Sequence, residues 1–205
     1  MFRGWPPEGP EFFEGLLADN SKSYWQAHQD IYERCVRAPM EALLAELQPE
    51  FGAGKVFRPY RDVRFSTDKS PYKTAIAATL AEGGYLQLSA DSFGVGCGLY
   101  RPEAEQLDRY RKAVADGRSG AALVKLVQQG RAAKLEISGH EELKTAPRGY
   151  PKDHPRIDLL RQKGLVAWRE WPLGPWLRTK APKGRVVDVL HAAEPIRAWL
   201  SKHVG

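Results

Sequence analysis

Cysteine is scarce in this chain of 205 residues, which contains only Cys35 and Cys97 and no Cys-x-x-Cys pair. Two thiols cannot build the disulfide framework of a small secreted domain, and their spacing excludes zinc-finger and zinc-ribbon sites. Cys35 falls at a core-facing position of a predicted helix, and Cys97 falls at one of a predicted strand. We therefore expect two reduced, buried thiols in a cytoplasmic protein.

Long apolar runs are also absent. No stretch approaches the roughly 20 apolar residues of a membrane span, and residues 1–10 lack the apolar core of a cleaved signal peptide. We expect no membrane association and a cytoplasmic location. The Gly-x-x-x-x-Gly-Lys-Ser/Thr phosphate loop and the dinucleotide-binding glycine fingerprint are missing as well. Their absence excludes the two nucleotide-binding classes that they define, and nothing in the chain indicates a cofactor.

The composition is that of an ordinary globular protein, with 42% hydrophobic and 27% charged residues. The length suits a single domain spanning residues 1–205. The net charge of +6 is unevenly spread. Residues 1–54 carry 4 basic and 9 acidic side chains, whereas residues 55–73 and residues 144–163 each carry 6 basic and 2 acidic ones. An acidic N-terminal layer therefore precedes two focused basic segments, which suit a small anion or a short nucleic-acid footprint.

The first 54 residues predict helices. Apolar residues recur at helical spacing after Pro10, and Ser21 or Ser23 is the expected N-cap of a longer helix. Pro39 should kink or restart that helix, which then continues to about Leu47. Further helices are predicted over residues 104–115, 119–129 and 186–203 and from Pro155 onward. In the last helix the residues expected to point inward are Val187, Leu190, Ile196, Trp199 and Leu200.

Strands are predicted between and after these helices. Short strands are expected over residues 63–66, 74–80, 134–138 and 165–171. For residues 74–80 the alternative is a helix capped at Ser70-Pro71, and a strand is the preferred interpretation. The clearest element is a hairpin formed by residues 84–90 and 93–100, with its turn at Asp91-Ser92. The elements do not alternate regularly as β-α-β. We therefore predict an α+β fold with a mainly antiparallel central sheet, packed by the N-terminal and C-terminal helices.

The second strand of this hairpin has one bare face, because Gly94, Gly96 and Gly98 occupy alternate positions. A strand stripped of side chains accommodates a close neighbour, which can be a packed element, an aromatic ring or a ligand. Close packing is one interpretation. The other is the floor of a ligand pocket, with polar contacts from Tyr85, Gln87 and Ser89.

Two basic loops, each stiffened by proline, hold the other candidate binding residues. Cations on stiffened backbone suit the recognition of a carboxylate or phosphate. The candidates in the first loop are Arg58, Arg61, Arg64, Lys69, Tyr72 and Lys73, and those in the second are Lys144, Arg148, Tyr150 and Arg156. A structural alternative is that Arg61 and Arg64 form ion pairs with the acidic N-terminal helices. The loops lie about 80 residues apart in sequence, yet their similar chemistry predicts that they meet in one site.

His154 is the candidate for proton transfer, because the ordinary pKa of histidine lies near neutrality. In a catalytic site it would act as general acid or base. It could equally cap the helix expected at Pro155. No group of His, Asp and Glu has metal-ligand spacing, so we predict no metal site.

The same segments resemble a known family. Several motifs are similar to the pattern of the domain of unknown function 2461 family, a set of conserved bacterial-type proteins: residues 57–66, 68–74, 84–91, 95–100 and 143–150. The pair Phe12-Phe13 and the pair Pro39-Met40 fit as well, so the resemblance covers nearly the whole chain. Cys97 stands where the pattern leads us to expect glycine. The resemblance implies no activity, cofactor or partner, because the family is known by its sequence pattern.

Three functional hypotheses remain open at this point. The preferred one is a basic pocket for a small phosphorylated or carboxylated ligand, with His154 as acid or base if the site is catalytic. The second is a nucleic-acid-binding module in which Tyr60, Tyr72 and Tyr150 stack on bases among the cations. The third is a protein-interaction or structural domain without catalytic activity.

Overall fold

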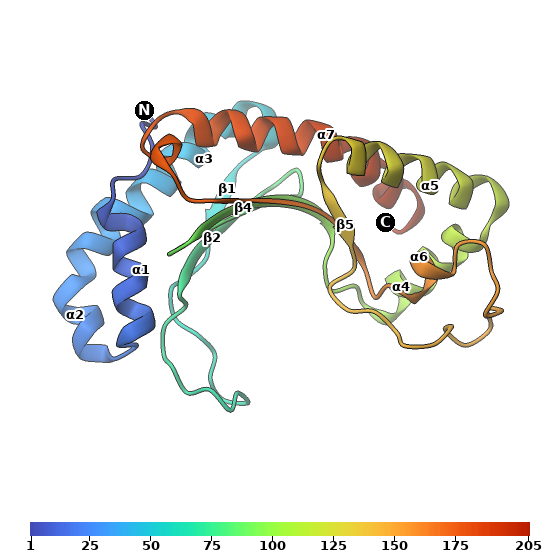
Figure 1. The fold of residues 1–205 in the computed structure, drawn as a ribbon, viewed down its shortest axis with the longest axis horizontal. Coiled ribbons are helices and arrows are strands. Elements are labelled where there is room, and N and C mark those ends of the chain that lie inside the picture. Colours follow the sequence, from blue (N-terminus) through green and yellow to red (C-terminus); the bar gives the residue numbers. More distant parts are fainter. The chain divides into compact units, whose positions relative to one another are not determined.

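The structure, a computed structural model, describes residues 1–205 and has the predicted α+β fold (Figure 1). Its helices and strands follow the chain in this order: α1 (Glu8–Ala18), α2 (Lys22–Ile31), the π-helix η1 (Tyr32–Arg37), α3 (Ala38–Phe51), β1 (Gly54–Val56), β2 (Ala75–Leu80), β3 (Gly84–Ser89), β4 (Ser92–Leu99), α4 (Ala104–Ala115), α5 (Gly117–Ala132), β5 (Glu136–Ser138), α6 (Ile157–Arg161), β6 (Leu165–Pro172), the 3₁₀-helix η2 (Pro175–Arg178) and α7 (Ala181–His203). None of the helices is both long enough and apolar enough to span a membrane.

The chain divides into two compact units. Unit 1 comprises Met1–Val95 and Glu170–Val187, and unit 2 comprises Gly96–Arg169 and Asp188–Gly205. The strands are hydrogen-bonded in the order β1-β2-β3-β4-β6-β5, and β1–β2, β2–β3 and β5–β6 pair antiparallel. The mainly antiparallel sheet is thus confirmed, and the description of residues 1–205 as one domain stays a prediction.

The helices of unit 1 begin largely where the sequence predicts. Ser21 is the N-cap of α2, and its side chain accepts a hydrogen bond from the Tyr24 N–H. The predicted interruption at Pro39 is preceded by the π-helix η1, in which the Ala38 N–H donates to the Glu33 carbonyl five residues earlier. Proline has no N–H and its ring crowds the preceding turn, which disturbs the regular helical pattern there. The helix then continues to Phe51, beyond the predicted end at Leu47.

Strands β2 and β3 of unit 1 have one buried and one half-buried face. Ile76 pairs with Leu88 and Ala78 pairs with Leu86, and all four side chains are buried. Helix α3 packs against β1 and β2, and α1 packs against β3. The alternate residues of the two strands, among them Tyr85 and Gln87, are half-buried on the opposite face. The period-two pattern in the sequence therefore predicted the two faces correctly.

Two local predictions in unit 1 were wrong. The hairpin turns at Ala90-Asp91, one residue earlier than predicted, because the Ser89 hydroxyl accepts the Ser92 N–H at 3.1 Å and closes the turn there. Residues 63–66 form a turn instead of a strand. The Asp62 carboxylate there accepts the backbone N–H of Arg64, two residues on, and such a local bond competes with strand pairing.

Unit 2 contains the predicted helical pair α4 and α5. Asp116 separates the two helices and caps α5, its side chain accepting the N–H groups of Arg118 and Ser119. We predicted that a helix begins at Pro155, but helix α6 begins two residues later, at Ile157. Helix α7 begins at Ala181, earlier than expected. Val186 is buried in place of Val187, whereas four other residues of α7 are buried as predicted, namely Leu190, Ile196, Trp199 and Leu200.

Close packing in unit 2 explains two glycines of β4, Gly96 and Gly98. A Cβ at Gly96 would lie 2.4 Å from the Ala167 carbonyl oxygen and 2.8 Å from the Trp168 ring, and one at Gly98 would lie 2.3 Å from the Leu165 carbonyl oxygen. The neighbours of these glycines are thus strand β6 and an indole ring. Of the two interpretations of the bare face, close packing is the one found at Gly96 and Gly98.

Both cysteines are buried and unpaired, as predicted. Burial raises the pKa of the Cys97 thiol to about 11, and it also raises the pKa of Cys35. Neither thiol is therefore activated as a nucleophile.

Candidate functional site

The first basic loop is an extension of the sheet, which we call the arm (residues 57–73). In Figure 1 it is the teal segment that runs beyond the ends of β1 and β2. Its two sides are hydrogen-bonded, because the Arg61 N–H donates to the Pro71 carbonyl at 2.9 Å and the Lys73 N–H donates to the Pro59 carbonyl at 2.8 Å. Tyr60 and Tyr72 form an antiparallel bridge between these bonds. The arm is therefore a two-stranded ribbon near its base.

The base of the arm is fixed to the N-terminal helices. The Asn20 side chain accepts the Tyr72 N–H at 3.0 Å and donates to the Tyr72 carbonyl at 3.1 Å. The Tyr72 ring is buried and stacks on Trp25 at a centroid distance of 4.5 Å. Tyr72, which the sequence suggested as a ligand contact, is thus an anchor of the arm.

We expect Asn20→Ala to destabilise unit 1 by about 1–3 kcal/mol, because it leaves a buried donor and acceptor of Tyr72 without partners. Urea unfolding measures the change, and hydrogen exchange of the Tyr72 amide reports the local effect. Asn20→Asp retains the acceptor and is expected to keep part of that protection. Equal protection of Tyr72 in the alanine variant and in the unmodified protein would contradict this role.

The tip of the arm is held by its own ion pairs. Arg61 bonds Asp68, Arg64 bonds Asp62 at 2.7 Å, and Lys69 donates to the Val63 carbonyl at 3.0 Å. Hydrogen bonds from Ser70 and then from Arg61 hold the pKa of Asp68 well below its usual range. The suggested pairing of Arg61 and Arg64 with the acidic N-terminal helices was therefore wrong. Their carboxylate partners lie a few residues away within the arm itself.

A bulge lies where the arm leaves the sheet. The Phe57 N–H donates to the Ala77 carbonyl, and the next bond on the arm side joins Lys73 to Pro59. A single residue, Arg58, therefore opposes the three residues 74–76. Extra residues in one strand bend it and turn side chains in new directions. The bulge accounts for the position of Arg58 and Lys73 at the junction of arm and sheet.

Beside this junction lies a group of residues that we call the platform: Lys55, Phe57, Lys73, Tyr85 and Gln87. The Lys73 Nζ lies 5.5 Å from the centroid of the Phe57 ring, and that ring lies 6.3 Å from the Tyr85 ring. The Tyr85 hydroxyl donates to Gln87 Oε1 at 3.0 Å. Lys55 pairs with Thr79 and Thr79 with Tyr85, which places Lys55 on the same face of the sheet.

The cations of the platform have no carboxylate partners. Lys55, Lys73 and the neighbouring Arg58 form no ion pair within 4 Å, in contrast to Arg61 and Arg64. Partial burial, followed by the charge of Arg58, lowers the pKa of Lys73. An ammonium group that is both desolvated and close to another cation is stabilised by an anion. The platform is therefore the part of the first loop that is suited to anion binding.

Ser89 has a different surrounding from Tyr85 and Gln87. Its hydroxyl donates to Asp91 Oδ1 at 2.6 Å and lies 3.0 Å from the Ser92 hydroxyl. These contacts belong to the hairpin turn. The structure therefore brings Tyr85 and Gln87 to the platform and gives Ser89 a role in the turn.

The second basic loop belongs to unit 2. Its turn is formed by Pro147 to Tyr150, with the Tyr150 N–H donating to the Pro147 carbonyl at 3.1 Å and Gly149 in the left-handed region at φ +88°. Lys144 and Arg148 are exposed and form no ion pair within 4 Å. Tyr150 is half-buried, and burial together with the nearby Asp108 raises its pKa. The loop thus presents two free cations beside a partly shielded phenol.

Arg156 has a structural role in unit 2. Its guanidinium donates to the carbonyls of Val114, Ala115 and Asp116 at 2.6, 2.7 and 3.2 Å. These carbonyls end helix α4, and a cation there satisfies them and complements the helix dipole. Of the four candidates in the second loop, Arg156 thus binds the end of helix α4.

His154 lies one turn before α6, and its Nδ1 accepts the Arg156 N–H at 3.0 Å. The N-cap of α6 is Arg156, and no side chain caps this helix. The His154 bond therefore closes the turn that precedes the helix, and the capping alternative suggested by the sequence was wrong. We expect His154→Asn to change the melting temperature by less than about 2 °C, because an asparagine side chain can accept the same N–H. Thermal unfolding measures this, with His154→Leu as the control that removes the acceptor. If the asparagine variant melts as low as the leucine variant, this bond does not stabilise the turn before α6.

The arm and the second loop lie in different units, so their meeting in one site stays a prediction. Within the described residues, no three His, Cys, Asp or Glu side chains group together in a way that could hold a metal ion.

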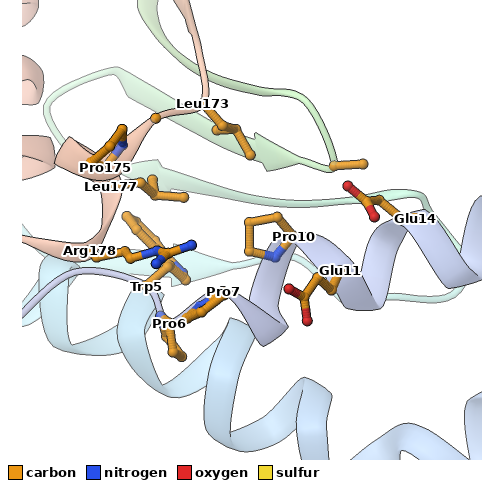
Figure 2. A pocket seen from close by; sticks show the side chains of 12 residues that line it. Trp5, Pro6, Pro7, Pro10, Glu11, Glu14, Leu173, Pro175, Leu177 and Arg178 are labelled. Carbon is orange, nitrogen blue, oxygen red and sulfur yellow. The ribbon is translucent and has the colours of Figure 1, made fainter.

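Unit 1 also contains a hollow of about 360 Å³ that the sequence did not predict. Figure 2 shows apolar rings on its walls and the carboxylates of Glu11 and Glu14 along α1, with the Arg178 guanidinium near Trp5. The residues around it are Trp5, Pro6, Pro7, Pro10, Glu11, Glu14, Ala90, Leu173, Gly174, Pro175, Leu177 and Arg178. They come from three distant segments, so no local motif could have indicated it. Two carboxylates against one guanidinium make the hollow a poor site for an anion.

The arm, the platform and the second loop all fall within a match to a known family. The sequence model of the family described as "Conserved hypothetical protein (DUF2461)" matches residues 8–199. The chain belongs to the DUF2461 family. No curated protein matches this DUF2461 member. A solved structure with similarity to it is described as the crystal structure of an uncharacterized protein from Methanothermobacter thermautotrophicus, with 11% sequence identity, a TM-score of 0.43, and coverage of 82% of this chain and 99% of that chain.

Proposed function

We propose that unit 1 of this DUF2461 protein binds the phosphate or carboxylate group of a ligand at the platform. The observation that carries the proposal is the half-buried Lys73 ammonium, which has Arg58 as its charged neighbour and no carboxylate within 4 Å. Nearby like charges repel, and a bound anion between them relieves the repulsion. The exposed Lys55 adds a third positive charge on the same face.

The chemistry of the platform suits a ligand with an anionic group and a flat or apolar body. Lys73 is a compact point donor, whereas Arg58 can donate a pair of parallel hydrogen bonds to a phosphate or carboxylate. The Phe57 ring, 37% exposed, offers apolar surface beside these donors. We infer binding from this arrangement. A catalytic role for His154 remains a proposal from the sequence.

Lys73→Ala is expected to weaken the binding of inorganic pyrophosphate by about 10- to 100-fold, since a hydrogen bond to a charged group contributes about 1.5–3 kcal/mol. Isothermal titration calorimetry measures the affinity. Lys125→Ala is the charge-matched control, because Lys125 is exposed on α5 in unit 2. An unchanged affinity in the Lys73 variant, or no binding by the unmodified protein, would refute the proposed site.

The same titration has an expected pH dependence. The pKa of Lys73 is lowered in the free protein, and a bound anion shifts it back toward its usual range. Binding should therefore be accompanied by proton uptake as the pH rises toward the pKa of Lys73 in the free protein. The affinity for the anion should fall as the pH rises further. Enthalpies measured in buffers of different ionisation heat report this uptake, which the Lys73→Ala variant should lose.

A further inference from the structure

The arm exposes large rings in an unusual way. The Phe65 side chain at its tip is 96% exposed, and Tyr60 nearer the base is 50% exposed. Between and beside these rings stand five cations and two carboxylates, which give residues 57–73 a net charge of +3. Single exposed apolar residues are common. Two rings on one projecting arm, separated by cations, indicate a surface for a partner that is both anionic and aromatic.

The arm holds Phe65 in a preformed turn. The ion pair of Arg61 with Asp68 spans the tip, and Arg64, the residue before Phe65, pairs with Asp62. The Arg64 guanidinium lies 5.8 Å from the centroid of the Phe65 ring. The base of the arm is fixed by Asn20. A partner that contacts Phe65 therefore pays little ordering entropy on this side of the interface.

The spread of the rings favours one class of partner. A membrane surface would contact the tip, and it would not use Tyr60 or Phe57 near the base. An acidic peptide would satisfy the cations, but its carboxylates have no flat faces for the rings. Single-stranded nucleic acid offers both negative charges and flat faces, because bases stack on aromatic side chains while backbone phosphates pair with Lys and Arg.

We propose that the arm binds single-stranded nucleic acid, with Phe65 and Tyr60 stacked on bases and the platform cations on backbone phosphates. This inference rests on the proposed anion site, since the platform supplies the phosphate contacts. The seven residue steps from Arg58 to Phe65 reach at most about 25 Å. At about 3.4 Å per stacked nucleotide, the arm covers no more than about seven nucleotides.

The test is fluorescence anisotropy with a labelled ten-nucleotide oligothymidylate at several salt concentrations. Three cations, Lys55 and Lys73 of the platform and the neighbouring Arg58, predict a slope of log affinity against log salt near −2, at about 0.7 per phosphate. Lys73→Ala should reduce the slope by about 0.7. Phe65→Ala should weaken binding by about 5- to 150-fold with an unchanged slope, because stacking contributes about 1–3 kcal/mol per base.

Controls separate this inference from the anion site. Leu17→Ala removes another exposed apolar side chain of unit 1 and should leave oligonucleotide binding unchanged. If pyrophosphate binds but the oligonucleotide binds no more tightly and Phe65→Ala has no effect, the nucleic-acid inference is overturned and the anion site stands. If neither binds, both proposals fail. Binding to phosphatidylserine vesicles or to a polyglutamate peptide, without binding to the oligonucleotide, overturns the inference in favour of a membrane or an acidic protein.

Discussion

Gly96→Val is expected to destabilise unit 2 by at least about 3 kcal/mol, and in a marginally stable protein it would prevent folding. A Cβ at this position lies 2.4 Å from the Ala167 carbonyl oxygen and 2.8 Å from the Trp168 ring. The carbonyl belongs to the backbone of the neighbouring strand, so no side-chain rotation relieves the contact. Overpacking of ordinary core positions costs about 1–3 kcal/mol, and this position is tighter than those. Urea unfolding measures the loss.

Gly184→Ala is the matched control for this prediction. Gly184 lies on α7, and a Cβ there meets nothing within 4 Å. Replacing an exposed helical glycine with alanine is expected to stabilise the protein by about 0.5–1 kcal/mol. If Gly96→Val and Gly184→Ala have similar stabilities, β6 does not pack on β4 as described.

Trp5→Ala is expected to destabilise unit 1 by about 3–5 kcal/mol, the usual cost of truncating a buried tryptophan. The Trp5 side chain is 0% exposed, and its ring lies 5.1 Å from Phe2 and 5.5 Å from Phe93. Its indole N–H also donates to the Val36 carbonyl at 3.1 Å, inside the π-helix. The substitution thus removes packing and leaves a buried carbonyl without its donor. Denaturant unfolding followed by circular dichroism measures the change.

Trp5→Phe separates the two contributions, since it retains much of the ring and removes the indole donor. We expect it to recover more than half of the lost stability. Leu17→Ala is the control for truncation at an exposed position. Leu17 lies on the exposed face of α1, and its substitution should change the free energy of unfolding by less than about 0.5 kcal/mol. A Trp5→Ala variant as stable as Leu17→Ala would mean that the N-terminal segment is not packed as described.

The candidate residues of the first loop show how far sequence reasoning reached. The cations and tyrosines of residues 58–73 could be named from charge and proline spacing alone. Sequence could not separate them by role, because all four are cations of one loop and their roles depend on which side chains lie nearby in the fold. The anchoring by Asn20 and the bulge at Arg58 depend on tertiary geometry. The ion pairs within the tip join residues two and seven positions apart, and they depend on how the tip of the arm turns.

The second loop shows the same limit. Its turn at Pro147 to Tyr150 depends on neighbouring residues only, and the left-handed backbone of Gly149 could be predicted from the sequence. The binding of Arg156 to the end of α4 could not, because the carbonyls that it contacts are about 40 residues earlier in the chain. Likewise, the hollow of unit 1 is built from three distant segments and has no local signature.

The sequence by itself determined the α+β class, the existence of the hairpin, the cap of α2, and the buried and half-buried faces of β3, because each depends on propensity and periodicity over a few residues. The tertiary structure alone decided what anchors the arm, which carbonyls Arg156 contacts and what covers the glycines of β4. Those outcomes depend on contacts between residues far apart in the chain. The periodicity of a single segment carries no information about such contacts.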